Sequence, residues 1–266
     1  MSTPEIPIGL STASVWPQQA ADAFGMAAEL GYDGVEVMVW AESVSQDPRA
    51  LSKLVKRYDM PVLAVHAPCL LVTQRVWSPD PVVRLRRAVA LAAELDAATV
   101  VVHPPFRWQR SYGDGFVELL KELEDASGVA VAVENMFPVR PLGSRRDWQV
   151  SGFRPSVDPT DVGHRHYTLD LSHTATAGMD AMALAARMGA GLCHVHLTDG
   201  SGTPRDEHLL PGTGTQPCAE LCAMLVDNEF RGDVTVEIST RRAPDRPARM
   251  RALAAGLKFA QRNLGR

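Results

Sequence analysis

Short apolar runs alternate with longer amphipathic segments along the whole chain. The runs are rich in Val, Ile and Leu, which is typical of buried strands. The segments between them are rich in Ala and Leu, and several begin after Pro or Asp and end at Gly, as helices do. The pattern predicts strands at 6–10, 34–39, 62–66, 99–103, 129–134, 167–171, 192–197 and 234–238. It predicts helices at 17–30, 48–58, 81–95, 115–126, 159–163, 179–188, 216–228 and 246–263.

Strands that alternate with helices in this way favour a parallel sheet with helices packed on it. Eight such units within 266 residues favour a closed barrel, since one barrel of this kind occupies about 250 residues. An open doubly wound sheet is the alternative, but no GxGxxG turn follows the first strand. We therefore expect an α/β fold, a (β/α)8 TIM barrel formed as a single domain by residues 1–266.

Residues inside the predicted strands alternate between two faces. In 129–134 the valines share one face, and Ala130, Ala132 and Glu134 share the other. The branched residues are expected to face the helices, so each inner face ends in an acid or a histidine. Active sites of this fold lie at the carboxyl ends of the strands. Repeated charged groups at that end indicate a functional site, because burying them unpaired is costly.

The stretch 194–214 carries the densest set of such groups. His194 and His196 lie on one face of the strand 192–197, and the Gly-rich loop that follows carries Asp206 and His208. Imidazoles and carboxylates that converge from a strand end and its loop are the ligands of zinc, manganese and related ions. We therefore expect a divalent metal site here.

Nine residues at or near predicted strand ends form the candidate ligand set. One ion needs four to six ligands, so nine indicate two or three ions, or a mixture of metal ligands and acid–base groups. Glu36, within an apolar strand, follows the same rule, whereas His164, His166 and His194 are interpreted as structural or supporting. The nine are His66, His103, Glu134, Asp170, His173, His196, Asp206, His208 and Glu237.

These residues lie in short motifs whose order resembles the xylose-isomerase-like TIM barrels, a superfamily that includes sugar phosphate isomerases, epimerases and endonuclease IV. The resemblance covers nearly the whole chain. The motifs are HAP at 66–68, HP at 103–104, EN at 134–135, LDLSH at 169–173, HLTD at 196–199, DEH at 206–208 followed by PGTG, and VEI at 236–238.

The isomerase and epimerase branch implies one divalent ion held by four of these positions. The matching residues are Glu134, Asp170, His196 and Glu237. By this resemblance Glu134 and Glu237 also flank the sugar and move a proton between adjacent carbons, and His173 binds a substrate hydroxyl. The ion polarises the carbonyl and stabilises the enediolate. A metal-dependent isomerase or epimerase of a small sugar or sugar phosphate is our leading hypothesis.

The endonuclease IV branch implies three zinc ions held by all nine positions, with a bridging hydroxide that attacks a phosphodiester. The second hypothesis is therefore a multinuclear zinc phosphodiesterase. Abasic DNA is a less favoured substrate, because Cys69 stands where the endonuclease has an aromatic residue and no long basic loop follows the second strand. We expect two ions, with the second at His66, His103 and Glu134, and a third available to His173, Asp206 and His208.

A long segment at 135–158 interrupts the regular pattern and is interpreted either as a lid or as a surface insertion. Basic residues near the expected mouth suit phosphate, and Trp40, Trp77 and Trp108 could wall a sugar. The basic residues are Arg107, Arg110, Arg145, Arg146, Arg241 and Arg242.

The charge and composition of the chain exclude few classes of partner but make some of them less favoured. The net charge of −4 gives no overall attraction to nucleic acid or to an anionic membrane. No signal peptide or membrane span is expected, and the four cysteines suggest no disulfide framework, so cytoplasm is the expected location. Cys218 and Cys222 are interpreted as ordinary half-buried thiols rather than metal ligands. A non-catalytic sugar-binding barrel is the third hypothesis. Oligomeric state is not predicted.

Overall fold

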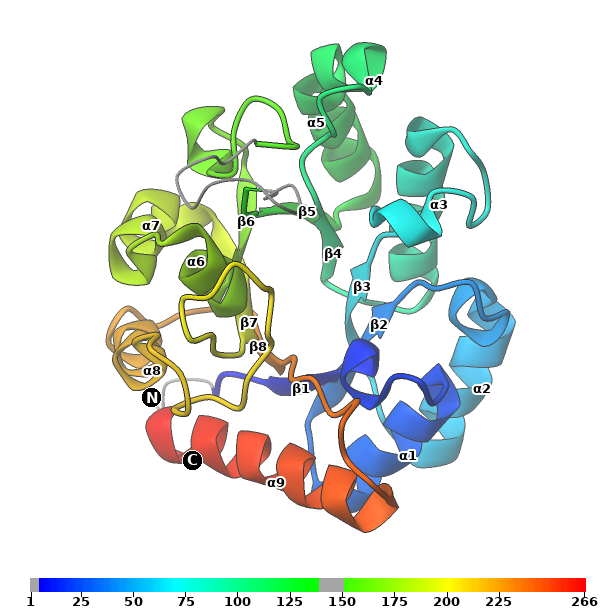
Figure 1. Cartoon of the computed structure of the whole chain (residues 1–266). Coiled ribbons are helices and arrows are strands. Elements are labelled where there is room, and N and C mark those ends of the chain that lie inside the picture. Colours follow the sequence, from blue (N-terminus) through cyan, green and yellow to red (C-terminus); the bar gives the residue numbers. More distant parts are fainter. Residues whose placement is uncertain (1–4, 139–150) are drawn as a thin grey trace.

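A computed structural model describes residues 5–138 and 151–266 of the chain. Its eight parallel strands close in sequence order into one barrel, with β8 paired to β1, which confirms the predicted (β/α)8 fold. Figure 1 looks along the barrel, with the helices as an outer ring. The strands are β1 (Ile8–Ser11), β2 (Gly34–Met38), β3 (Val62–His66), β4 (Thr99–Val102), β5 (Ala130–Glu134), β6 (His166–Asp170), β7 (Leu192–Leu197) and β8 (Asp233–Val236).

The larger helices begin where acidic side chains cap their first turn. Asp47, Asp80 and Asp245 each accept a backbone N–H and are followed within two residues by Pro, which fits a helix start. The α-helices are α1 (Ala20–Leu30), α2 (Pro48–Tyr58), α3 (Pro81–Glu94), α4 (Arg110–Asp114), α5 (Phe116–Ser127), α6 (Leu171–Ala177), α7 (Ala181–Met188), α8 (Cys218–Asp227) and α9 (Arg246–Asn263). Short 3-10 turns are η1 (Thr12–Val15), η2 (Val44–Gln46), η3 (Leu71–Thr73), η4 (Pro159–Asp161) and η5 (Gly189–Gly191).

The sequence pattern missed α4 and α6. We assigned Leu171 to the sixth strand, but the strand ends at Asp170, whose side chain accepts the backbone N–H of His173 at 2.7 Å and starts α6. The segment predicted as a helix at 159–163 is only the 3-10 turn η4. The eighth strand ends at Val236, so Glu237 stands on the segment just beyond it.

The hydrophobic core lies between the barrel and its helices, as the alternation in the strands predicted. Val131 and Val133 belong to the main hydrophobic cluster, whereas the intervening Ala132 does not. The barrel interior instead contains buried polar residues, among them Glu36, Thr168 and His194. This arrangement leaves charged groups inside the barrel that need partners.

The described residues bear on the expected absence of a membrane span and on the segment 135–158. No helix within 5–138 and 151–266 is long and apolar enough to cross a membrane. Residues 139–150, which carry Arg145, Arg146 and half of the segment 135–158 interpreted as a lid or a surface insertion, lie outside the described residues.

Candidate metal centre

All nine predicted ligand residues gather at the carboxyl end of the barrel. His66 ends β3, Glu134 ends β5 and His196 lies near the end of β7. Asp170 ends β6, and the other five lie just beyond strand ends, in α6 or on the loop that follows β7. The structure therefore brings together side chains from six strands and their connections, although it does not by itself assign them a role.

The first group surrounds one ring nitrogen of His196. Its Nδ1 atom lies 3.0 Å from Glu134 Oε1, 3.3 Å from Asp170 Oδ2 and 3.0 Å from Glu237 Oε2. Each of these four side chains is nine-tenths or more buried. A single ring proton can serve one or two of the three oxygens, so the group has more acceptors than donors.

The second group uses the other oxygen of Glu134. Glu134 Oε2 lies 3.0 Å from His103 Nε2 and 3.5 Å from His66 Nε2. His66 Nδ1 is in contact with the carbonyl oxygen of Ala67 at 3.1 Å, which fixes the ring with Nε2 toward Glu134. Glu134 therefore joins the first and second groups through its two oxygens.

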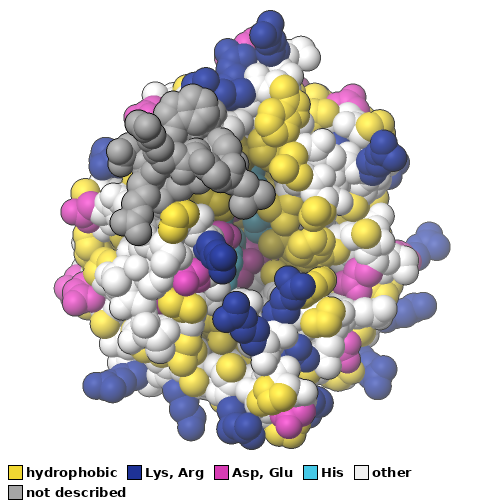
Figure 2. Space-filling view, viewed as in Figure 1, with side chains coloured by type: hydrophobic (Ala, Val, Ile, Leu, Met, Phe, Trp, Pro, Cys, Tyr) yellow, Lys and Arg dark blue, Asp and Glu magenta, His cyan; other side chains and the backbone are white. Residues whose placement is uncertain are grey.

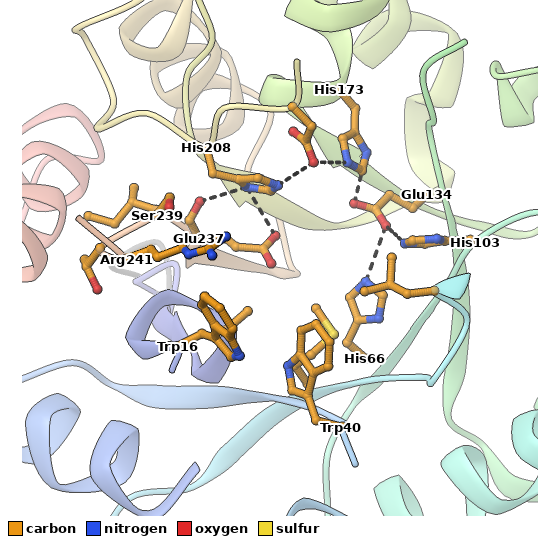
Figure 3. Close-up of a pocket in the computed structure, with 16 residues that line it drawn as sticks. Trp16, Trp40, His66, His103, Glu134, His173, His208, Glu237, Ser239 and Arg241 are labelled. Carbon is orange, nitrogen blue, oxygen red and sulfur yellow. Dashed lines mark hydrogen bonds and ion pairs between the residues drawn. The ribbon is translucent and has the colours of Figure 1, made fainter. Parts of the chain in front are cut away.

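The third group lies beside α6. Asp206 Oδ2 is 3.4 Å from His173 Nε2 and 2.9 Å from His208 Nε2. His208 Nδ1 is also 3.9 Å from Glu237 Oε2, so this group adjoins the first. Figure 3 shows the chain of contacts running from His208 through His173 to Glu134 and the two histidines beyond it.

Ser172 in α6 holds the loop that carries Asp206 and His208. Its hydroxyl donates to Asp206 Oδ1 at 2.6 Å and accepts the backbone N–H of His208 at 3.0 Å. His208 has a φ of 45°, a left-handed conformation that is uncommon for a side chain of this kind.

Asp199 explains the HLTD and PGTG motifs of the same loop. Its carboxylate accepts backbone N–H groups of Gly200 and Gln216 on one oxygen, and of Gly212 and Gly214 on the other, at 2.8–3.0 Å. A Cβ at position 214 would lie 2.3 Å from Asp199 Oδ1, so only glycine fits there. Asp199 is thus a loop organiser rather than a ligand.

Burial and charge act in opposite directions on the titrating groups. Burial raises the pKa of a carboxyl, but the neighbouring His173 and His196 hold the pKa of Glu134 well below its usual range. Burial alone lowers the pKa of His173, yet Asp170 and Asp206 raise it to about 10. Glu237 differs, since burial outweighs its histidine neighbours and raises its pKa.

The residues fit one or more divalent cations. Glu134 Oε2, Asp170 Oδ2 and His103 Nδ1 are buried and have no hydrogen-bond partner among the described residues. Glu134 Oε2 nevertheless has two imidazole nitrogens within 3.5 Å, which are not aligned as hydrogen bonds. Imidazole and carboxylate donors together suit zinc or manganese, and a cation would balance the excess of carboxylate oxygens.

A cavity of about 350 Å³ opens above these groups. Figure 2 shows histidine and acidic side chains at the floor of a central hollow, with basic and hydrophobic side chains around its rim. Figure 3 shows Trp16 and Trp40 across the cavity from His173 and Glu134. Arg241 also lines the cavity, and its guanidinium lies 4.5 Å from the ring centre of Trp16.

The predicted rim residues divide into two sets. Trp40 and Arg241 line the cavity, and Trp16, which the sequence analysis did not name, joins them. The others lie outside the lining: Trp77, Trp108, Arg107, Arg110 and Arg242. Cys69 does not line it either, but lies in a smaller recess behind His103.

Glu36 is the main participant that the candidate set left out. It is fully buried, and its carboxylate contacts both His194 and His196. The sequence held a signal, because a glutamate in the middle of an apolar strand needs a buried partner. The identity of that partner depends on the closed barrel, which brings β2 and β7 together.

Comparison with protein families identifies the fold family. The family model described as xylose isomerase-like TIM barrel matches residues 24–262 of the chain. The chain belongs to that family. An uncharacterized protein of Mycobacterium tuberculosis is 55% identical over an alignment of 276 positions. The alignment covers 98% of this chain and 99% of the relative.

More distant relatives of the family include sugar epimerases. A fructoselysine 3-epimerase of Shigella flexneri is 23% identical over 241 residues, covering 82% of this chain and 84% of that protein. The crystal structure of a D-tagatose 3-epimerase-like protein superposes with a TM-score of 0.67 at 22% identity, covering 97% of this chain and 99% of the other. At this level of identity the structural match establishes the fold alone.

Proposed function

We propose that this protein is a divalent-metal-dependent isomerase or epimerase of a small sugar or sugar phosphate. The observation that carries the proposal is the convergence of three carboxylates on His196 Nδ1 at the floor of an open cavity. Two of these carboxylates, Glu134 and Glu237, also line the cavity, so they can reach a substrate. The names of the epimerase relatives support sugars as the substrate class.

Glu134, Asp170, His196 and Glu237 would hold the ion. When bound, a divalent ion stabilises the negative charge that develops when a proton leaves a carbon next to a carbonyl. We assign Glu134 and Glu237 to the proton transfer, one carboxylate removing the proton and the other returning it. His173 is assigned to a substrate hydroxyl, because its Nδ1 is occupied by the carbonyl of Asn135 at 2.8 Å and its Nε2 is directed to the cavity side, near Asp206.

The cavity suits a monosaccharide derivative. Its volume of about 350 Å³ lies near the lower end of ordinary ligand pockets. Trp16 and Trp40 offer apolar surface to the carbon face of a sugar ring, while Arg241 offers a planar cation for a phosphate at the rim. The finer choice between a free sugar and a sugar phosphate therefore depends on Arg241.

The direct test is exchange of a carbon-bound hydrogen with solvent. The protein loaded with Mn²⁺ or Zn²⁺ is incubated in D2O with ketohexoses, ketopentoses and their phosphates, and the sugars are followed by proton NMR. We expect deuterium at the carbon next to the carbonyl of a substrate together with a new isomer, and loss of both in Glu237→Gln. Metal-loaded protein that neither exchanges hydrogen nor forms an isomer with any of these sugars would contradict the proposal.

A second candidate function is a multinuclear phosphodiesterase. The observation that favours it is the linkage of all three groups, which offers places for more than one ion. Glu134 joins the first group to the second, and its Oε1 lies 3.5 Å from His173 Nδ1 of the third. We expect at least two ions per chain, with His66, His103 and Glu134 holding the second. Elemental analysis after saturation with zinc or manganese and gel filtration measures this number, and one ion per chain would remove the support for this function.

The two candidates separate in a cleavage assay. A DNA duplex with one abasic site is incubated with zinc-loaded protein, and we expect little strand cleavage. Efficient cleavage that is lost in Asp206→Asn would place the phosphodiesterase first. Cleavage that persists in that variant would indicate a contaminating nuclease.

A further inference from the structure

A carboxylate lies directly behind the proposed metal centre. Glu36 in β2 accepts a hydrogen bond from His196 Nε2 at 2.9 Å, on the side of the ring opposite the three carboxylates. The same oxygen accepts from His194 Nε2 at 3.1 Å, and its other oxygen accepts from the Ser11 hydroxyl at 2.8 Å. None of the four side chains is exposed to solvent, so Glu36 has three donors and no contact with bulk solvent.

The contacts continue toward the opposite end of the barrel. His194 Nδ1 lies 2.8 Å from Asp233 Oδ2, and Asp233 is the first residue of β8. The mouth lies beyond the other end of that strand, where Glu237 stands. The row therefore runs Asp233, His194, Glu36 and His196 along the interior of the barrel.

We propose that Asp233, His194 and Glu36 form a positioning relay that directs His196 Nδ1 toward the ion. A neutral imidazole carries one proton, which either nitrogen can hold. Glu36 accepts this proton on Nε2, which leaves the lone pair of Nδ1 directed at Glu134, Asp170 and Glu237. Without Glu36 the proton can move to Nδ1 and pair with one of those carboxylates, which blocks the ion. The relay thus selects the metal-binding tautomer.

The donor and acceptor balance separates the relay from a further metal site. Glu36 and both histidine Nε2 atoms are matched as donors and acceptors at hydrogen-bond distances. His194 Nδ1 is 2.8 Å from Asp233 Oδ2 but is not aligned with it as a hydrogen bond. The group at the mouth, in contrast, keeps buried oxygens without hydrogen-bond partners among the described residues. Replacing the acceptor that binds the second ring nitrogen of a metal-bound histidine typically weakens metal binding by about 10- to 100-fold.

The test compares zinc affinity in matched variants. Glu36→Gln keeps the side-chain shape but removes the charged acceptor, and Asp233→Asn cuts the far end of the relay. Affinity is measured by competition with a chromophoric chelator, on protein whose folding is verified by circular dichroism. This inference rests on the metal centre of the proposed function, so wild-type zinc binding is measured first. Failure of the wild type to bind zinc refutes the metal centre, whereas equal binding by wild type and variants refutes only the relay.

Glu124→Gln is the control. Glu124 in α5 is also a buried carboxylate, in contact with His166 Nδ1 at 2.6 Å, but it lies away from the mouth. Its replacement removes a buried charge of the same kind, so it reports the effect of lost stability alone. The expected zinc dissociation constant of this variant is that of the wild type within about twofold.

We expect roughly 10- to 100-fold weaker zinc binding in Glu36→Gln and a loss of several-fold in Asp233→Asn. The double variant should bind no more weakly than Glu36→Gln, because the relay is already interrupted. Cobalt-loaded Glu36→Gln should also show shifted visible absorption bands, which lost stability alone does not produce. Should Glu36→Gln not fold, Asp233→Asn decides. Zinc affinity and cobalt spectrum both unchanged in a folded relay variant would overturn the proposal.

Discussion

Two carboxylate–histidine clusters with buried acids occupy different parts of this barrel and differ in their balance of donors and acceptors. Away from the mouth, Glu124 Oε1 accepts from His166 Nδ1 at 2.6 Å and from the backbone N–H of Val131 at 3.1 Å. At the mouth, three carboxylates face one nitrogen of His196. Donors match acceptors in the first cluster and are too few in the second. Burial of acids and histidines therefore does not distinguish the two clusters; the mismatch between donors and acceptors does.

The largest effect should come from removing the carboxylate that joins two of the mouth groups. Glu134→Gln takes a charge from both the His196 group and the His66–His103 group. We expect a loss of metal and a fall in turnover of about 100-fold or more, because the proposed metal ligation and the proposed proton transfer both involve this residue. Metal analysis and the deuterium exchange assay measure the two losses. Unchanged metal content, even with Glu237→Gln added, would refute the centre.

Removal of the metal should affect the mouth and leave the Glu124 cluster unchanged. An ion whose free concentration is about 100 times its dissociation constant stabilises the folded state by about 2.7 kcal/mol. Its removal by a chelator should therefore lower the melting temperature by roughly 5–10 °C. Differential scanning calorimetry with and without a chelator measures the shift. Amide exchange should accelerate near Asp170 and not at Val131. An identical melting temperature in both conditions would show that the mismatch is tolerated without a cation.

The smallest effect concerns His164, which lies near Glu124. Burial lowers the pKa of His164 to about 4 although Glu124 acts to raise it, whereas the acids at the mouth raise the pKa of His173 to about 10. Between pH 6.5 and 4, His164 is protonated in the unfolded chain but still neutral in the folded protein. Falling pH therefore favours the unfolded chain and lowers the free energy of unfolding. His164→Gln should reduce this loss by about 1 kcal/mol, given partial solvent screening. Urea unfolding of wild type and variant at both pH values measures the difference, and parallel pH profiles would contradict it.

The sequence predicted the barrel and the strand-end members of the candidate set because both depend on local periodicity. Alternation within 129–134 assigned valines to the helices and Glu134 to the interior, and the structure agrees. Assignment of ligand roles to the nine residues stays a prediction. Local signals failed at α6, whose sequence LSHTATA is rich in residues of modest helix propensity and depends on the Asp170 cap.

Contacts between strands distant in the chain could not be predicted from periodicity. Glu36 and His194 meet only because the closed barrel places β2 and β7 across its interior. The same limit applies to the cavity wall. Trp16 was missed and Trp108 was chosen, although Trp108 is 59% exposed and stacks on Phe106 outside the cavity lining. Residue type indicates what a side chain can do, and the tertiary fold determines where it lies.

Closure of the barrel has a consequence for the order of folding. The last strand, β8, pairs with β7 on one side and with β1 on the other, and Glu237 follows it directly. The pairing of β8 with β1 joins the two ends of the chain, which is the most distant pairing in sequence and the slowest kind to form. The candidate ligand set is therefore complete only after β8 has joined the barrel. Metal uptake during refolding should report insertion of the last strand, and the ion should slow unfolding by holding that strand in place.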